Sequence, residues 1–201
     1  MKKLSLGSTT LVCVDCLHYA KAVRAIQYSI KDIEFKEVLF FTDVHIFVPS
    51  GVTTCIIPTI NSKEEYCNFL VNKVIDYVKT DYLLVIQWDG FVLHPESWTD
   101  KFLEYDYIGA TWGYQDPWRV GNGGFSLRSR ALMDIVRNDI NIDLIFPEDH
   151  HICRTYRPYL EYIGIKYAPE NVANLFAVEC NGKLDKQFGF HQPRTHDIVQ
   201  I

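Results

Sequence analysis

The sequence predicts a mixed α/β fold with a Rossmann-type, mainly parallel sheet flanked by helices. Up to Phe91, short apolar runs typical of strands alternate with longer segments whose apolar residues recur at helical spacing. Strands that alternate with helices pair in parallel through right-handed crossovers. The chain has 201 residues, of which 48% are hydrophobic, and this is enough for one substantial core. We therefore expect a single domain over residues 1–201.

Four strand candidates and two helices make up the first part of the chain. The strand candidates span residues 10–15, 37–43, 54–60 and 81–86. The last of them is the most hydrophobic, which suggests burial on both faces of the sheet. One helix is expected over residues 19–33, and a second begins at the capping box of residues 62–65. Beyond this part the pattern is irregular, with helices expected over residues 129–138 and around 150–156.

The charge and the apolar runs exclude several classes of protein. The net charge is −5 and no block of lysine or arginine occurs, which argues against nucleic-acid binding. The N-terminal segment does not have the pattern of a signal peptide, and no apolar run approaches the roughly 20 residues of a membrane span. The six cysteines are scattered and no glycosylation sequon is present, so we expect a cytoplasmic protein.

Acidic residues follow three of the strand candidates. Because sites in parallel sheets lie beyond the carboxyl ends of the strands, Asp15, Asp43 and Asp89 are expected to converge on one crevice. Asp89 is followed by Gly90 and ends the most hydrophobic strand, where a carboxylate would suit Mg²⁺ or Mn²⁺. The alternative is that this Asp-Gly pair simply begins a turn, as isolated pairs usually do.

Two further motifs could carry chemistry. Gly121, Gly123 and Gly124 permit positive φ or a close backbone approach to a ligand, although a tight structural turn explains them equally well. Glu148 and Asp149 stand at an expected helix start, which favours an ionised carboxylate ready to accept a proton. Simple capping of the helix is the alternative.

Taken together, these motifs resemble a bacterial family of glycosyltransferases of the GT-A type, many of whose members are described only as a domain of unknown function. The resemblance runs from about Val38 to His191, which is most of the chain. The motifs that carry it are Gln87–Pro95 with Trp98, Tyr105–Ala110, Val120–Arg130, Pro147–Asp149 with Ile152–Arg154, Phe176–Glu179 and Phe188–His191.

The resemblance implies a metal site. In GT-A enzymes an Asp-x-Asp motif ends the central strand and its last Asp commonly binds the metal, so Asp89 inherits this role. His191 stands where a histidine often completes the metal shell. Gln87 replaces the first Asp of the motif, and the loss of one charge leaves weak metal binding or a metal-independent enzyme as alternatives.

The resemblance also assigns catalytic and donor-binding residues. Asp149 matches the general base of inverting members, with Glu148 as its neighbour, and the Gly123–Gly124 loop resembles the segment that lies against the donor sugar. Trp112 could stack on a sugar face, although core packing explains it equally well. The residues expected to bind the nucleotide-sugar are Asp15, Asp43, Gln87, Gly123, Gly124 and Trp112.

The expected function is transfer of a sugar, with inversion, from a nucleotide-sugar to an acceptor hydroxyl. A UDP-sugar is the expected donor, Mn²⁺ or Mg²⁺ the expected cofactor, and a glycan in polysaccharide biosynthesis the expected acceptor. One alternative is a metal-dependent hydrolase or nucleotidyltransferase that uses His150 and His151 besides the carboxylates. However, adjacent helical residues point about 100° apart and do not readily share one ion. The other alternative is a non-catalytic carbohydrate-binding relative.

Overall fold

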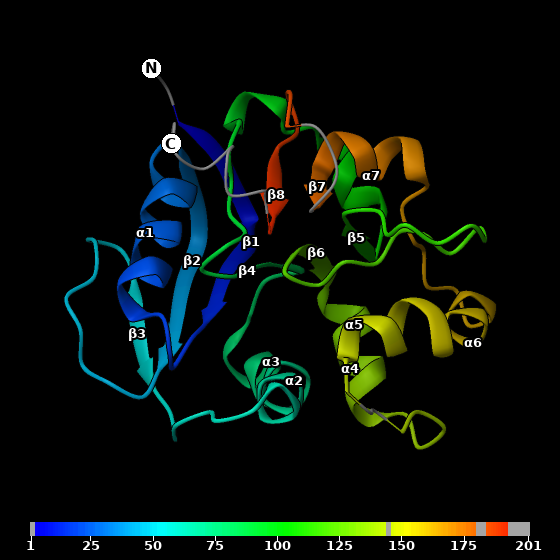
Figure 1. The fold of residues 1–201 in the computed structure, drawn as a ribbon, viewed down its shortest axis with the longest axis horizontal. Helices are drawn as coiled ribbons and strands as arrows, with labels where there is room; N and C mark the ends of the chain where they lie inside the picture. Colours follow the sequence, from blue (N-terminus) through cyan, green and yellow to red (C-terminus); the bar gives the residue numbers. More distant parts are fainter. Residues whose placement is uncertain (1–2, 144–145, 180–183, 193–201) are drawn as a thin grey trace.

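The computed structural model describes residues 3–143, 146–179 and 184–192. Its centre is a six-stranded sheet in the order β3-β2-β1-β4-β6-β5 (Figure 1). The strands are β1 (Leu4–Val14), β2 (Ile33–Thr42), β3 (Thr53–Ile56), β4 (Tyr82–Ile86), β5 (Tyr107–Gly109) and β6 (Phe125–Ser129). Strands β3, β2, β1 and β4 run parallel, whereas β6 is antiparallel to β4 and β5. The predicted mixed, mainly parallel sheet is confirmed.

Helices cover both faces of this sheet. They are α1 (Tyr19–Ile30), α2 (Lys63–Asn72), α3 (Val74–Tyr77), α4 (Arg130–Asn138), α5 (Glu148–His150), α6 (Arg157–Tyr162) and α7 (Glu170–Phe176), with 3-10 turns at Pro95–Ser97 and Asp100–Glu104 and a π-helical turn at His151–Thr155. Helices α1 and α7 contribute to the core on one face, and α2, α3 and α4 to the core on the other. A second, two-stranded parallel sheet joins β7 (Ala177–Glu179) and β8 (Gly189–His191).

Strand β1 shows why the central strands read as continuous apolar runs. Leu11 and Cys13 pack into the core under α1, while Val12 and Val14 pack into the core under α2, and all four are buried. A strand that is buried on both faces needs apolar residues at every position rather than at alternate positions. The end of this strand is therefore held by packing on both faces of the sheet.

Serine caps mark the starts of α2 and α4, as the sequence indicates. Pairing between strands decides where α1 ends. Ser62 accepts a hydrogen bond from the backbone of Glu65 and caps α2, and Ser129 caps α4 in the same way. Helix α1 ends at Ile30, because Ile33 already begins β2 and pairs with β1. Strand β6, which precedes α4, was not predicted from the sequence.

Strand β6 carries the one fully buried arginine in the described part of the chain, Arg128. Its guanidinium forms an ion pair with Glu148, 2.9 Å between Nη2 and Oε1, and both side chains are almost inaccessible to solvent. The Nε atom donates to Ser126 Oγ, and Nη2 also reaches the carbonyl oxygen of Gly123. One side chain thus connects the sheet, the glycine loop and α5.

Among the described residues, no helix combines the length and apolar character that crossing a membrane requires.

Removing the buried arginine should damage the fold strongly. In Arg128→Met the carboxylate of Glu148 would remain buried without its partner, so we expect the free energy of unfolding to fall by about 3–5 kcal/mol. The control is Arg137→Met, which breaks the partly exposed pair with Asp76 and should cost less than about 1 kcal/mol. Urea unfolding measures both values. Equal losses in the two variants would contradict the structural role of Arg128.

Candidate active site

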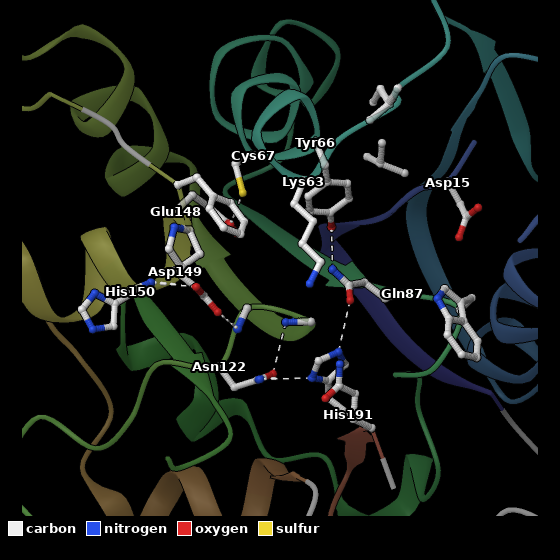
Figure 2. Close-up of a pocket in the computed structure, with 18 of the residues that line it drawn as sticks. Asp15, Lys63, Tyr66, Cys67, Gln87, Asn122, Glu148, Asp149, His150 and His191 are labelled. Atoms are coloured by element: carbon white, nitrogen blue, oxygen red, sulfur yellow. Dashed lines mark hydrogen bonds between the residues drawn. The ribbon is translucent and has the colours of Figure 1, made fainter. Parts of the chain in front are cut away.

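A cavity of about 620 Å³ opens beyond the carboxyl ends of β1 and β4, where parallel sheets commonly bind ligands (Figure 2). Its walls come from the loop after β1, the first turns of α2, the glycine loop before β6, and α5. Glu179 and His191, from the small sheet of β7 and β8, complete the lining. Segments from across the sequence therefore meet at this point.

A chain of hydrogen bonds crosses the cavity from α2 to β7. The Nε2 atom of Gln87 donates to the Tyr66 hydroxyl at 3.0 Å, and Gln87 Oε1 lies 3.1 Å from His191 Nε2. On the other side of the imidazole, Asn122 Nδ2 lies 3.1 Å from His191 Nδ1 (Figure 2). The same Nδ2 group donates to Glu179 Oε1 at 2.6 Å. Each member therefore restrains the orientation of the next.

The backbone of the glycine loop determines which nitrogen of His191 carries the proton. Gly124 N–H donates to Asn122 Oδ1 at 3.1 Å, so the Nδ2 group of Asn122 must face His191 Nδ1, which acts as an acceptor. The proton of the neutral imidazole then resides on Nε2 and is donated to Gln87 Oε1. This assignment follows from the network of hydrogen bonds.

The residues implied as metal ligands can fit one divalent cation. Among the described residues, Asp89 Oδ1 is buried without a hydrogen-bond partner, and it lies 3.7 Å from His191 Nε2. Gln87 Oε1 is 3.1 Å from the same nitrogen, and neighbouring ligands on an octahedral ion are separated by roughly 3 Å. In the described part of the chain, no set of three or more His, Cys, Asp and Glu side chains is arranged to hold a metal. Because Asp89 supplies the one carboxylate among these three residues, we expect the divalent cation to bind weakly.

Asp149 is held in the cavity by two backbone groups. Its Oδ2 accepts the N–H of Gly123 at 3.0 Å, and its Oδ1 accepts the N–H of His150 at 2.7 Å. Burial, and next the neighbouring charge of Glu148, raise the pKa of Asp149 to about 6. This value lies close to neutral pH, as the chemistry of a general base requires.

Glu148 is differently placed from its neighbour. It is buried, its Oε1 pairs with Arg128 and its Oε2 accepts from the Cys67 thiol at 2.9 Å. Both carboxylate oxygens are therefore occupied within the protein, whereas Asp149 keeps its backbone contacts at the cavity surface. The two adjacent acids thus have different surroundings.

The structure brings together most, but not all, of the residues predicted for the site. Those that line the cavity are Asp15, Gln87, Trp112, Gly123, Gly124, Glu148, Asp149 and His191. Asp43 is outside the lining and accepts hydrogen bonds from Tyr19 and Thr59. The expected convergence of three acids on one crevice is therefore not what the structure shows.

A tight turn explains why Gln87 rather than Asp89 faces the cavity. Two backbone hydrogen bonds join Gln87 and Gly90, so the chain reverses immediately after β4. Asp89, at the tip of this turn, is absent from the described lining and lies against His191. Asp15 lines the cavity, and its Oδ1 also accepts the N–H groups of Leu17 and His18 before α1.

The glycines of the loop are needed for close approach. Neither Gly123 nor Gly124 has a positive φ, so the conformational explanation does not apply to them. A Cβ atom at Gly124 would lie 2.1 Å from His191 Nε2, and one at Gly123 would lie 2.8 Å from the Cβ of Asp149. The loop thus allows both functional side chains to touch the backbone.

The family model described as "Protein of unknown function (DUF5672)" matches residues 52–191. The chain belongs to this family. In the DUF5672 chain, the matched region contains Gln87, the glycine loop, Asp149 and His191, which are most of the cavity side chains described above. A search of curated proteins gave no match.

A solved structure with a similar fold is that of a mannosyltransferase, PcManGT from Pyrobaculum calidifontis, in complex with GDP-Man and Mn²⁺. The two chains are 8% identical with a TM-score of 0.51, and the match covers 81% of the DUF5672 chain. It covers 55% of the mannosyltransferase, so the DUF5672 chain spans about half the length of that protein. At this identity the likeness is one of fold, and it confirms the GT-A-like architecture.

Sequence reasoning missed several residues of the site in the DUF5672 chain. Asn122 and Glu179 belong to motifs that carried the family resemblance, but no local pattern indicates that both contact His191. Lys63 and Tyr66 were assigned only to a helix, although both line the cavity. Of the adjacent histidines in the hydrolase alternative, His150 lines the cavity and His151 is not among the described lining residues.

A single methyl group should displace His191. Gly124→Ala places a Cβ atom on the imidazole, so we expect loss of the hydrogen bonds to Gln87 and Asn122 and of about 1–3 kcal/mol of stability. Nitrogen NMR of labelled histidine should show the Nε2–H tautomer in the wild type and its loss in the variant. The control is Gly113→Ala, because no atom of the described residues lies within 4 Å of a Cβ atom at that position. An unchanged His191 signal in Gly124→Ala would refute this geometry.

The raised pKa of Asp149 predicts that this residue makes the free energy of unfolding depend on pH. A folded-state pKa of about 6, above the usual value of about 3.9, means that the folded chain binds the proton more tightly than the unfolded chain. The contribution of Asp149 to stability should therefore decrease as the pH rises from about 4 to about 6, so the stability of Asp149→Asn relative to the wild type should rise over this range. Urea midpoints across this range would measure the difference. A difference that is constant with pH would contradict the prediction.

Proposed function

We propose that residues 1–201 form a cytoplasmic glycosyltransferase domain that moves a sugar from a nucleotide-sugar to an acceptor hydroxyl with inversion. The observation that carries this proposal is the position of Asp149. Its carboxylate lies at the surface of the same cavity as Gln87 and His191, and it is held by the glycine loop. The similar fold of a mannosyltransferase seen with GDP-Man supports a nucleotide-sugar donor. We propose a UDP-sugar or a GDP-sugar as donor and a glycan as acceptor.

Asp149 is the proposed general base. The attacking hydroxyl must lose its proton as the new glycosidic bond forms, and a carboxylate with a pKa of about 6 is largely ionised at neutral pH. The N–H groups of Gly123 and His150 fix the orientation of this carboxylate. Attack assisted by such a base is a single displacement, which inverts the anomeric centre.

Glu148 is proposed as a positioning residue. Its carboxylate is bound to Arg128 and Cys67, so it holds the start of α5 in place instead of meeting the substrate. Its negative charge also contributes to the raised pKa of Asp149. The two acids assigned as catalytic from the sequence thus take different roles in the proposal.

Asp89 and His191, with Gln87, are the residues that would hold Mn²⁺ or Mg²⁺. When bound, the ion supplies Lewis-acid stabilisation of the leaving diphosphate. Asn122 and Glu179 hold the imidazole of His191 from its far side. To bind the ion through Nε2, His191 would carry its proton on Nδ1, where Glu179 Oε1, 3.4 Å away, can accept it.

The base role predicts a specific loss of turnover in Asp149→Asn. Asparagine keeps the size of the side chain but lacks basicity, so kcat should fall by about 10²- to 10⁴-fold while donor affinity changes little. The assay is release of sugar to water from UDP-glucose, UDP-galactose and GDP-mannose, which requires no known acceptor.

The control and the stereochemistry make this test decisive. Asp134→Asn introduces the same change on the surface of α4 and should leave turnover unchanged. Proton NMR of the sugar released first reports its anomeric configuration. A product with the configuration of the donor would show that Asp149 is not the base of an inverting reaction, even if its substitution impairs turnover.

A further inference from the structure

Lys63 is the only lysine or arginine among the described residues that line the cavity. It is the first residue of α2, and its side chain points into the cavity in the direction of Gln87 (Figure 2). Tyr66 and Cys67, three and four positions later, share this face of the helix and also line the cavity. With the described residues, the ammonium group of Lys63 forms no hydrogen bond or ion pair. Its charge is thus available to a ligand.

The position of Lys63 does not favour the helix that carries it. The N-terminus of a helix has a partial positive charge, so a cation in the first turn is repelled. Ser62, Glu64 and Glu65 are the residues that suit this helix start, and Ser62 provides the cap. Helix stability therefore gives no reason for a lysine here.

None of the described neighbouring groups of the cavity contacts the ammonium group of Lys63 through a hydrogen bond or ion pair. Gln87 is neutral, and its amide is bonded to Tyr66 at one end and to His191 at the other. The carboxylates of the lining are engaged by other donors: Asp15 by the N–H groups after β1, Asp149 by Gly123 and His150, Glu179 by Asn122, and Glu148 by Arg128. Asp15, Asp149 and Glu179 keep their negative charges, because their donors are neutral, but none of these described carboxylates pairs with Lys63. The ammonium group is therefore open to an anionic group of a ligand.

We propose that Lys63 binds a phosphate group of the ligand, namely the diphosphate of the nucleotide-sugar, and supplies positive charge there without a metal. This inference rests on the proposed function for the identity of the ligand. The implied metal site has a single carboxylate, Asp89, because Gln87 stands at the other position. The ammonium group of Lys63 would supply attraction for the diphosphate that this weak metal site lacks. Part of the diphosphate affinity should therefore persist when metal is removed.

Calorimetric titration in excess EDTA tests this inference. The probes are UDP, GDP and inorganic pyrophosphate, added to the wild-type chain and to Lys63→Ala and Lys63→Arg. A charge-assisted hydrogen bond to phosphate predicts a loss of affinity of about ten- to hundred-fold in Lys63→Ala, with most of it regained in Lys63→Arg. Lys73→Ala, at the other end of α2 and outside the described lining, should bind as the wild type does. The unfolding temperature of Lys63→Ala should be unchanged or slightly raised, which excludes a folding defect.

The possible outcomes separate this inference from the proposed function. Equal binding of all probes by wild type and Lys63→Ala overturns the role of Lys63 and leaves the transferase proposal intact. Binding of pyrophosphate through Lys63 without binding of UDP or GDP, even with Mn²⁺, supports the anion site and counts against a UDP- or GDP-sugar donor. Binding of UDP or GDP only when Mn²⁺ is present overturns the inference alone. Absence of binding by every probe in EDTA and in Mn²⁺ overturns both.

Discussion

The buried ion pair between Arg128 and Glu148 is the interaction on which the rest of the site depends. It joins three parts of the chain that are distant in sequence: strand β6, the glycine loop through Gly123, and helix α5. Burying two charges is costly unless both are paired and hydrogen-bonded, so the pair tolerates little displacement of either element. Asp149 follows Glu148 directly, and its carboxylate accepts the N–H of Gly123. The position of the proposed base is thus set by a contact that it does not make itself.

The glycine loop connects this unit to the second functional group of the cavity. Asn122 faces His191 and Glu179, whereas the next residue, Gly123, faces Asp149. Adjacent residues therefore hold the proposed base on one side and the histidine on the other. Absence of a side chain at two positions lets both groups approach the backbone, and the Asn122 amide then fixes the imidazole. The short segment of Asn122 and Gly123 therefore sets the positions of the proposed base and of His191 relative to each other.

The sequence predicted what depends on local chemistry and missed what depends on long-range pairing. The cap at Ser62 needs only a hydroxyl and a nearby backbone N–H, and it was predicted. The crossovers between parallel strands follow from the alternation of strands and helices. By contrast, β6 lies antiparallel between β4 and β5, and its own residues contain no pattern that predicts this strand pairing. The resemblance to a family supplied the candidates Asp149 and His191, but only the structure shows their surroundings.

Gln87 differs from a carboxylate at the same position in its charge, although both would form the same hydrogen bonds. The amide accepts from His191 Nε2 and donates to the Tyr66 hydroxyl. A carboxylate at this position would accept from both, since a tyrosine hydroxyl can donate as well as accept, so the same chain of contacts would persist. What would differ is the charge: a carboxylate would add a negative charge beside His191 and on the wall that Lys63 faces (Figure 2). That charge would strengthen a cation site and oppose a diphosphate. In the proposed site, the amide would therefore favour direct binding of the anion over binding of a metal.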